Sequence, residues 1–118
     1  MPAALNFRLA QHGDFNVVQD IRRQTISGDY FESTFHSERS NPDHYFTVVE
    51  DLSGADPPGA PVIAYGLLEI TGFEASLLEM AVLPAAQNKG VGLQLLNHLL
   101  DYALTAKIST VFLEVRKS

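Results

Sequence analysis

Hydrophobic and polar positions follow two different periods along this chain, and together they predict five strands and three helices. Alternating or β-rich runs predict strands at residues 5–10, 45–51, 61–71, 75–83 and 109–115. Apolar residues at helical spacing predict helices at 13–26, behind a possible N-cap at Asp14, and at 92–106, with a short helix between them that ends before Pro42. The segment 52–60 carries two prolines and small residues, which suits an exposed hairpin loop.

The predicted helix at 92–106 is rich in leucine. Its leucines stand at 93, 95, 96, 99, 100 and 104. They cover more than one narrow stripe, so we expect this helix to be buried against a sheet. The element order β-α-α-β-β-β-α-β then predicts an α/β fold: a mixed sheet flanked by helices, with parallel strands across the last strand–helix–strand unit.

Composition limits the class of protein. A chain of 118 residues that is 46% hydrophobic predicts one domain, 1–118, with a single site. The net charge of −6 argues against a nucleic-acid binder, because such a protein must neutralise phosphates, and it is compatible with a basic partner. The chain has no cysteine, which excludes disulfides and a cysteine acyl-enzyme. With no signal-peptide pattern and no run of membrane-spanning length, we expect a cytoplasmic protein without membrane contact.

The loop before the leucine-rich helix carries two glycines, Gly90 and Gly92, beside Lys89. The first turn of a helix has backbone N–H groups without intrahelical partners, and the helix dipole favours an anion there. A tight turn is the plain alternative. A dinucleotide fingerprint would need a third glycine where Leu95 stands, although Glu114 lies near the position of its acidic residue, and a nucleoside-triphosphate loop would need the lysine after the glycine.

The segment Gln87-Asn88-Lys89-Gly90-Val91-Gly92 resembles the acyl-CoA pyrophosphate loop of the GNAT N-acetyltransferase superfamily. That pattern is Arg or Gln, two variable residues, Gly, one variable residue, then Gly or Ala. The flanking segments at 74–84 and 111–118 are similar to the ribosomal-protein-alanine N-acetyltransferase (RimI-like) branch, which acetylates protein N-terminal amines.

This resemblance implies that acetyl-CoA is the cosubstrate, that no metal takes part, and that an amine attacks the thioester directly. The strand residues Met80, Ala81 and Val82 would hold the pantetheine arm, and one of their N–H groups would polarise the thioester carbonyl. The pyrophosphate would be bound by Gln87, Asn88, Lys89, Gly90, Val91, Gly92 and Leu93.

Deprotonation of the amine needs a general base, for which Glu114 is the first candidate. Its apolar neighbours Phe112, Leu113 and Val115 favour a raised pKa, and it matches the glutamate that serves as base in the resembling branch. An ion pair with Arg116, on the same strand face, is the alternative. Glu79, in the other central strand, is the reserve candidate or else a solvated strand residue.

Other polar residues carry weaker signals. A group in the segment before the second strand matches no common metal pattern, and we expect a solvated loop. Its members are His36, Glu38, Asp43 and His44. Tyr30 and Phe31 either line an acceptor groove or, as the default, pack in the core, and His98 is expected at the edge of its helix.

In the resembling branch an asparagine, a tyrosine-bearing helix and two strands follow the closing strand, whereas this sequence stops at Ser118. By comparison with that branch we expect the domain 1–118 to be C-terminally incomplete, with its general acid unassigned, and residues 110–116 to form an apolar sheet edge. We expect a second copy to cover that edge in a homodimer. The leading hypothesis is an N-acetyltransferase acting on a protein or peptide N-terminus, and the acidic charge balance suits a basic one. A non-catalytic acyl-CoA-binding or dimerisation module and a small nucleotide-binding α/β protein are the alternatives.

Overall fold

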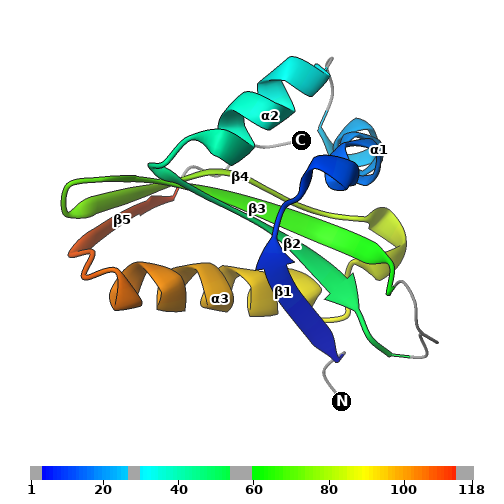
Figure 1. Cartoon of the computed structure of the whole chain (residues 1–118). Helices are drawn as coiled ribbons and strands as arrows, with labels where there is room; N and C mark the ends of the chain where they lie inside the picture. The colour runs from blue at the N-terminus through cyan, green and yellow to red at the C-terminus, as the bar shows by residue number, and fades with distance from the viewer. Residues whose placement is uncertain (1–3, 27–29, 54–59, 114–118) are drawn as a thin grey trace.

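The computed structural model describes residues 4–26, 30–53 and 60–113, and within them five strands form one twisted sheet (Figure 1). The strands are β1 Leu5–Leu9, β2 His44–Asp51, β3 Val62–Thr71, β4 Glu74–Val82 and β5 Thr110–Leu113. The helices are α1 Phe15–Thr25, α2 Glu32–Ser40 and α3 Val91–Thr105, with short 3-10 turns η1 at His12–Asp14 and η2 at Pro84–Ala86. The predicted element order is confirmed.

Neighbouring strands in the sheet follow the order β1-β2-β3-β4-β5. The first four strands pair antiparallel, and β4 pairs with β5 in parallel, as the strand–helix–strand pattern predicted. Within the described residues, β5 pairs with β4 only from Glu74 to Leu77. The remainder of β4, which continues toward the glycine loop, has no partner strand on that side among these residues.

The helices cover both faces of the sheet (Figure 1). On one face α1 and α2 enclose a core that includes Ile21, Phe35 and Tyr65, all fully buried. On the other face α3 packs Leu95 and Leu99 against the sheet. Side chains that alternate along β4 therefore reach two separate cores.

Helix α3 buries one stripe, which is narrower than its leucine content predicts. The buried positions recur at every fourth residue: Val91, Leu95, Leu99 and Ala103. The expected burial of this helix against a sheet is confirmed along that stripe, whereas Leu93 and Leu104 are exposed. Residues four apart lie on the same face of a helix, so these four positions form the face of α3 that packs on the sheet.

Asp14 lies beside the start of α1 but does not cap it with its side chain. Its carboxylate instead accepts two hydrogen bonds from Arg8, at 2.8 and 2.9 Å, and one from the Gln11 N–H at 2.7 Å. Asp14 thus occupies the predicted N-cap position of α1, but its side chain does not cap the helix, because the ion pair with Arg8 of β1 uses its oxygens. This contact fixes α1 against the sheet edge.

A β-bulge interrupts the pairing of β3 and β4. Leu67 pairs with Glu79 and Leu68 with Leu77, which leaves Leu78 as the extra residue. A bulge re-aims the side chains on its strand and often lies beside a functional site. Here it directs both Leu78 and Glu79 toward the face covered by α1 and α2. None of the described helices has the length and apolarity that a bilayer crossing requires.

Candidate active site

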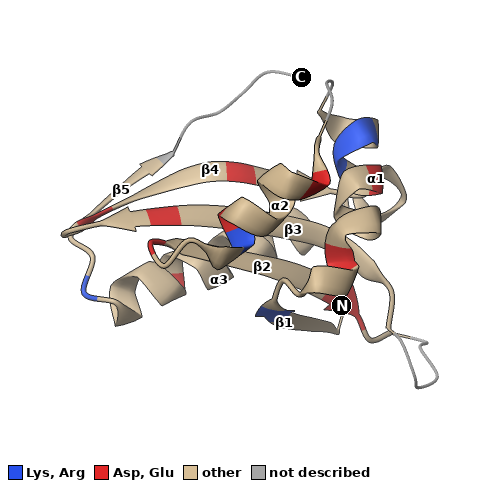
Figure 2. Ribbon diagram, turned by 45° about the horizontal axis from the view of Figure 1, so that its top comes forward, with Lys and Arg blue, Asp and Glu red and all other residues tan. Residues whose placement is uncertain are grey.

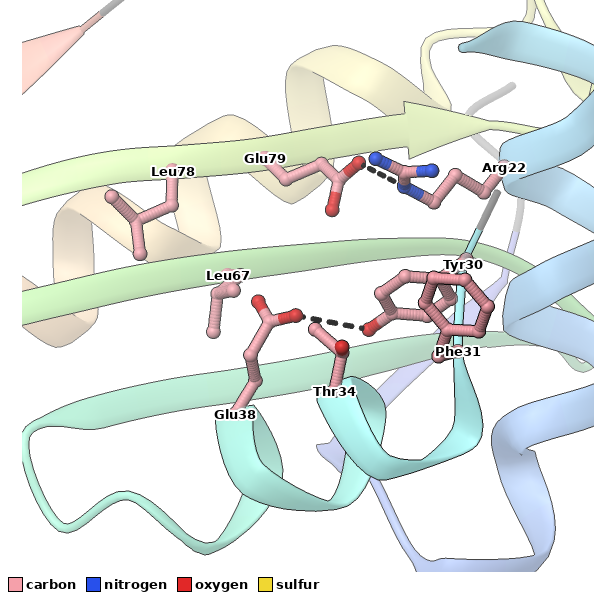
Figure 3. A pocket seen from close by; sticks show the side chains of 8 residues that line it. All are labelled: Arg22, Tyr30, Phe31, Thr34, Glu38, Leu67, Leu78 and Glu79. Atoms are coloured by element: carbon pink, nitrogen blue, oxygen red, sulfur yellow. Dashed lines mark hydrogen bonds and ion pairs between the residues drawn. The ribbon is translucent and has the colours of Figure 1, made fainter. Parts of the chain in front are cut away.

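A pocket of about 220 Å³ opens between α1, α2 and the bulged part of β4 (Figure 3). Its wall combines two carboxylates with one guanidinium, aromatic rings and apolar side chains. The lining residues are Arg22, Tyr30, Phe31, Thr34, Glu38, Leu67, Leu78 and Glu79. Core packing was the favoured prediction for Tyr30 and Phe31, with a place in a groove as the alternative. Both residues line this pocket, and Tyr30 is also largely buried.

Glu79 is held from α1 by an ion pair. The Arg22 Nε lies 2.8 Å from Glu79 Oε1, and the two side chains are only 18% and 15% exposed. The Arg22 guanidinium also lies over the Tyr30 ring, 4.9 Å from its centroid, in cation–π geometry. The reserve candidate for the base is therefore a paired, largely buried carboxylate rather than a solvated strand residue.

Glu38 faces the same pocket from α2, and Figure 3 shows its carboxylate directed into the space that Glu79 borders from the opposite side. The Tyr30 hydroxyl donates to Glu38 Oε1 over 3.4 Å, which is long for an O–H···O bond. Burial and the nearby charge of Glu79 raise the pKa of Glu38. Glu38 is thus an ionisable group whose charged form lacks strong partners among the described residues.

A buried phenol, Tyr65 in β3, lies near Glu79. Its hydroxyl makes no hydrogen bond with the described residues, and burial together with the carboxylate of Glu79 raises its pKa. A buried hydroxyl without a partner is costly, and in native proteins such groups often serve a ligand or bound water. Tyr65 therefore adds a buried hydroxyl close to Glu79.

Beyond the bulge, β4 leads directly to the glycine loop. The Gln87 side-chain Nε2 donates to the Val82 carbonyl over 2.9 Å, which closes the loop onto the end of β4. Asn88 and Gly90 have positive φ values of 64° and 81°, which asparagine and glycine tolerate best. These two left-handed residues turn the chain so that α3 begins at Val91.

The start of α3 offers free backbone donors. The N-cap Gly90 has no side chain, and the first helical bond runs from the Gln94 N–H to the Gly90 carbonyl. Among the residues that the structure describes, none accepts a hydrogen bond from the N–H groups of 91–93. Lys89 is exposed at the rim. An anion such as a phosphate would satisfy these donors and gain from the helix dipole.

Within the described residues, the site residues predicted from the sequence lie in strand β4 and in the glycine loop and helix start that follow it. The segment from Met80 to Val82 spans both faces: Ala81 packs in the core under α1 and α2, while Met80 and Val82 pack under α3. One strand thus joins the loop at 87–92 to the pocket at Glu79. Glu114 and Arg116 lie outside the described residues, so Glu114 as base stays a prediction.

Three polar pocket residues were not predicted as site residues from the sequence: Arg22, Thr34 and Glu38. The expectation of a solvated loop is wrong for His36 and Glu38, because both lie on α2. It is also wrong for His44, which begins β2 and has a side chain only 8% exposed. The available signal was the spacing of Glu38 three residues after the buried Phe35, which puts both near one helix face. No group of three or more potential metal ligands gathers among residues 4–26, 30–53 and 60–113. His98 is partly buried, stacks on Phe7 and contacts the Tyr45 hydroxyl.

Comparison with known proteins gives a consistent result. Residues 14–118 match the acetyltransferase (GNAT) family. The [ribosomal protein bS18]-alanine N-acetyltransferase of Salmonella typhimurium is 40% identical over 55 residues, which are 47% of this chain and 37% of that protein. The match therefore spans little more than a third of that relative's length.

Two solved structures show the same fold. The ribosomal-protein-S18-alanine N-acetyltransferase of Escherichia coli superposes with a TM-score of 0.78 at 24% identity, covering 98% of this chain and 69% of the other. The PaiA N-acetyltransferase of Thermoplasma acidophilum, in complex with coenzyme A, superposes with a TM-score of 0.80 at 18% identity, covering 98% and 81%. The predicted family and fold class are confirmed.

Proposed function

The chain belongs to the GNAT acetyltransferase family, and we propose that it transfers an acetyl group from acetyl-CoA to a primary amine, with the N-terminus of a protein or peptide as acceptor. The observation that carries this proposal is the course of β4. Glu79 lines the pocket, and three residues further Val82 is tied to the glycine loop through Gln87. An acceptor in the pocket and a CoA thioester along β4 would therefore meet at the bulge.

The residues present fit acetyl-CoA. The unpaired N–H groups of 91–93 and the side chain of Lys89 suit its pyrophosphate. The edge of β4 beyond Leu77, which has no partner strand among the described residues, suits the amide groups of the pantetheine arm. When bound, acetyl-CoA supplies an activated acetyl group as a thioester, whose carbonyl carbon the amine attacks with release of the CoA thiol.

The chain's own residues position the amine and accept its proton. A primary amine is mostly protonated at neutral pH, so a carboxylate must take one proton before or during attack. Glu79 and Glu38 are the described carboxylates that face the pocket. Glu114 remains the candidate predicted from the family resemblance. Burial keeps the Tyr30 hydroxyl protonated by raising its pKa, so it acts as a donor toward Glu38.

The relative's name supports an N-terminal amine as acceptor, since the matched protein is an alanine N-acetyltransferase. The acidic balance of the chain, 14 Asp and Glu against 8 Lys and Arg, also favours encounter with a basic peptide. Figure 2 shows acidic positions in β3 and β4 as well as in the helices.

The test combines calorimetric titration of acetyl-CoA with an assay of acetyl transfer to a peptide bearing a free N-terminal alanine. We expect binding and turnover by the wild-type chain. Glu114→Gln and Glu79→Gln should each leave the acetyl-CoA affinity nearly unchanged, and the base is the one whose loss reduces kcat by 10²-fold or more, a typical contribution of about 10²–10⁴. Glu32→Gln, on the exposed side of α2, is the matched control.

Two outcomes would contradict the proposal. Binding of acetyl-CoA without turnover of any amine would favour a non-catalytic acyl-CoA-binding module. Tighter binding of NAD than of acetyl-CoA would remove the pyrophosphate assignment of the loop at 87–92.

A further inference from the structure

We infer that Glu38 is the residue that pairs with the ammonium of the acceptor and thereby selects cationic amines that carry no neighbouring negative charge. This inference rests on the proposed function and assigns the acceptor side of the same site. It gives Glu38 a role in acceptor binding and leaves proton removal to another carboxylate.

The two carboxylates of the pocket differ in whether a cation of the described residues is paired with them. Glu79 accepts a 2.8 Å hydrogen bond from the Arg22 guanidinium, which is a strong, charge-assisted contact. Glu38 accepts only the 3.4 Å contact from the neutral Tyr30 hydroxyl among the side chains of the described residues. An incoming cation therefore gains more at Glu38, where no described cation is bound to the carboxylate.

The surroundings of Glu38 make a paired cation favourable. Its carboxylate is partly buried beside the apolar side chain of Leu67, and burial together with the charge of Glu79 raises its pKa. A buried charge without a partner is costly, and an ammonium with N–H donors would remove that cost.

The other residues that line the pocket limit which chemical groups an acceptor can carry next to its ammonium. Phe31 and Leu78 are exposed at the mouth and, with Leu67, provide apolar contacts for a small side chain next to the amine. The pocket charge is that of two carboxylates and one guanidinium, so its sum is negative. An acceptor with a carboxylate or phosphate beside its amine would place like charges close together in a partly desolvated space.

The experiment compares Glu38→Gln and Glu38→Asp with the wild-type chain and with Glu32→Gln. Glu32 starts the same helix, but its side chain is 61% exposed and outside the pocket. Two peptides serve as probes: both have a free N-terminal alanine, followed by lysine in one and by glutamate in the other. Acetylation gives kcat and KM, and titration of each peptide into the enzyme with CoA gives a dissociation constant without turnover.

For the wild type we expect the lysine peptide to bind more tightly than the glutamate peptide. Glu38→Gln should raise KM and the dissociation constant of the lysine peptide by about tenfold or more, with kcat within about threefold. It should also reduce the discrimination between the two peptides. Glu38→Asp should recover part of the affinity, and Glu32→Gln and all acetyl-CoA affinities should stay unchanged.

The inference is overturned if Glu38→Gln leaves peptide affinity and discrimination unchanged, or if it lowers kcat while KM is unaltered. In either case the wild type still turns over and the proposed function stands. If the wild type acetylates neither peptide nor any other amine, the proposed function itself fails, so the two failures are distinguishable.

Discussion

Arg22 and Glu79 connect helix α1 to strand β4 through a contact of 2.8 Å, at the bulge where the strand turns toward the pocket. Both side chains are largely shielded from water, so the pair differs from an exposed salt bridge, which contributes little to stability. The contact fixes the orientation of Glu79, and it neutralises one of the two described carboxylates that face the pocket.

This pair should show measurable coupling in a double-mutant cycle. We expect the free energies of unfolding of Arg22→Gln, Glu79→Gln and the double variant to give a coupling of about 1–2 kcal/mol from urea denaturation. The cycle is needed because Arg22 makes further contacts, including the one with Tyr30, whose loss a single variant would also report. The pair of His36 with the exposed Glu32, at 3.7 Å, is the control and should couple far less. A coupling near zero for Arg22 and Glu79 would show that the contact is not maintained in solution.

The charge of Glu79 should also control the pH dependence of acceptor binding. Burial is the main cause of the raised pKa of Glu38, and the charge of Glu79 raises it further. Tyr30, His44 and Arg22 act in the opposite direction and lower this pKa. Since an ammonium pairs only with the ionised carboxylate, peptide affinity should fall as the pH drops through this raised pKa. Glu79→Gln removes one negative neighbour, so the pKa of Glu38 should fall and the acid limb should move to lower pH. Peptide titrations with CoA across pH check this, with Glu32→Gln as the variant that should not move the limb.

Much of the fold could be predicted from the sequence because local pattern and tertiary burial agree. The β-rich run at 61–71 and the apolar helix at 92–106 lie within one residue of β3 and α3. The predictions failed where a single tertiary contact decides what a side chain does. Asp14 had the sequence of a cap, and only the approach of Arg8 from β1 showed that its oxygens are used elsewhere.

The site could be predicted where it is local in the sequence. The loop at 87–92 is a continuous segment, so its left-handed residues and helix start follow from residue types. The pocket combines residues separated by 57 positions in the Arg22–Glu79 pair, and a single sequence does not specify such a pairing. Glu38 was missed because α2 is mostly polar, which hides its helical period.

The backbone conformation of Gly90 offers a test of the loop. Its φ of 81° disfavours any side chain, so Gly90→Ala should cost about 1–2 kcal/mol of stability and weaken acetyl-CoA binding. Gly72 is the matched control, since its φ of 62° implies similar strain far from the loop in the β3–β4 turn. Gly72→Ala should lose comparable stability in urea denaturation without any change in acetyl-CoA affinity by calorimetry. Equal loss of affinity in both variants would mean that the loop has no direct part in binding.

Close packing of α3 on the sheet depends on Gly66 in β3. A Cβ added there would lie 2.9 Å from Leu99 Cδ1 and 3.4 Å from Leu95 Cδ1, and both leucines are fully buried. Gly66→Ala should therefore destabilise the protein by about 1–3 kcal/mol through overpacking, measured as a lower urea midpoint. Gly13→Ala is the control, because nothing lies within 4 Å of the added Cβ. An unchanged midpoint for Gly66→Ala would show that α3 is free to move away from the sheet.

The ion pair of Asp14 with Arg8 should make folding stability depend on pH in the acid range. Burial alone would raise the pKa of Asp14, but the hydrogen bonds from Arg8 and the Gln11 N–H outweigh it and hold that pKa below its ordinary value. Because the folded-state pKa is the lower one, the contribution to stability is complete above the unfolded-state pKa, about 3.9, and is lost as the pH falls through the folded-state value.

Asp14→Asn should therefore lower the free energy of unfolding by about 2 kcal/mol at neutral pH, and the gap to the wild type should narrow as the pH is taken below about 4. Urea denaturation at a series of pH values measures both effects. Asp20→Asn is the control, since Asp20 is exposed on α1 and, within the described part of the chain, its side chain accepts only a hydrogen bond from Gln24 at 3.2 Å. A gap for Asp14→Asn that stays constant over the whole range would mean that the substitution acts through packing alone, and that the charge of Asp14 does not hold η1 and α1 against β1.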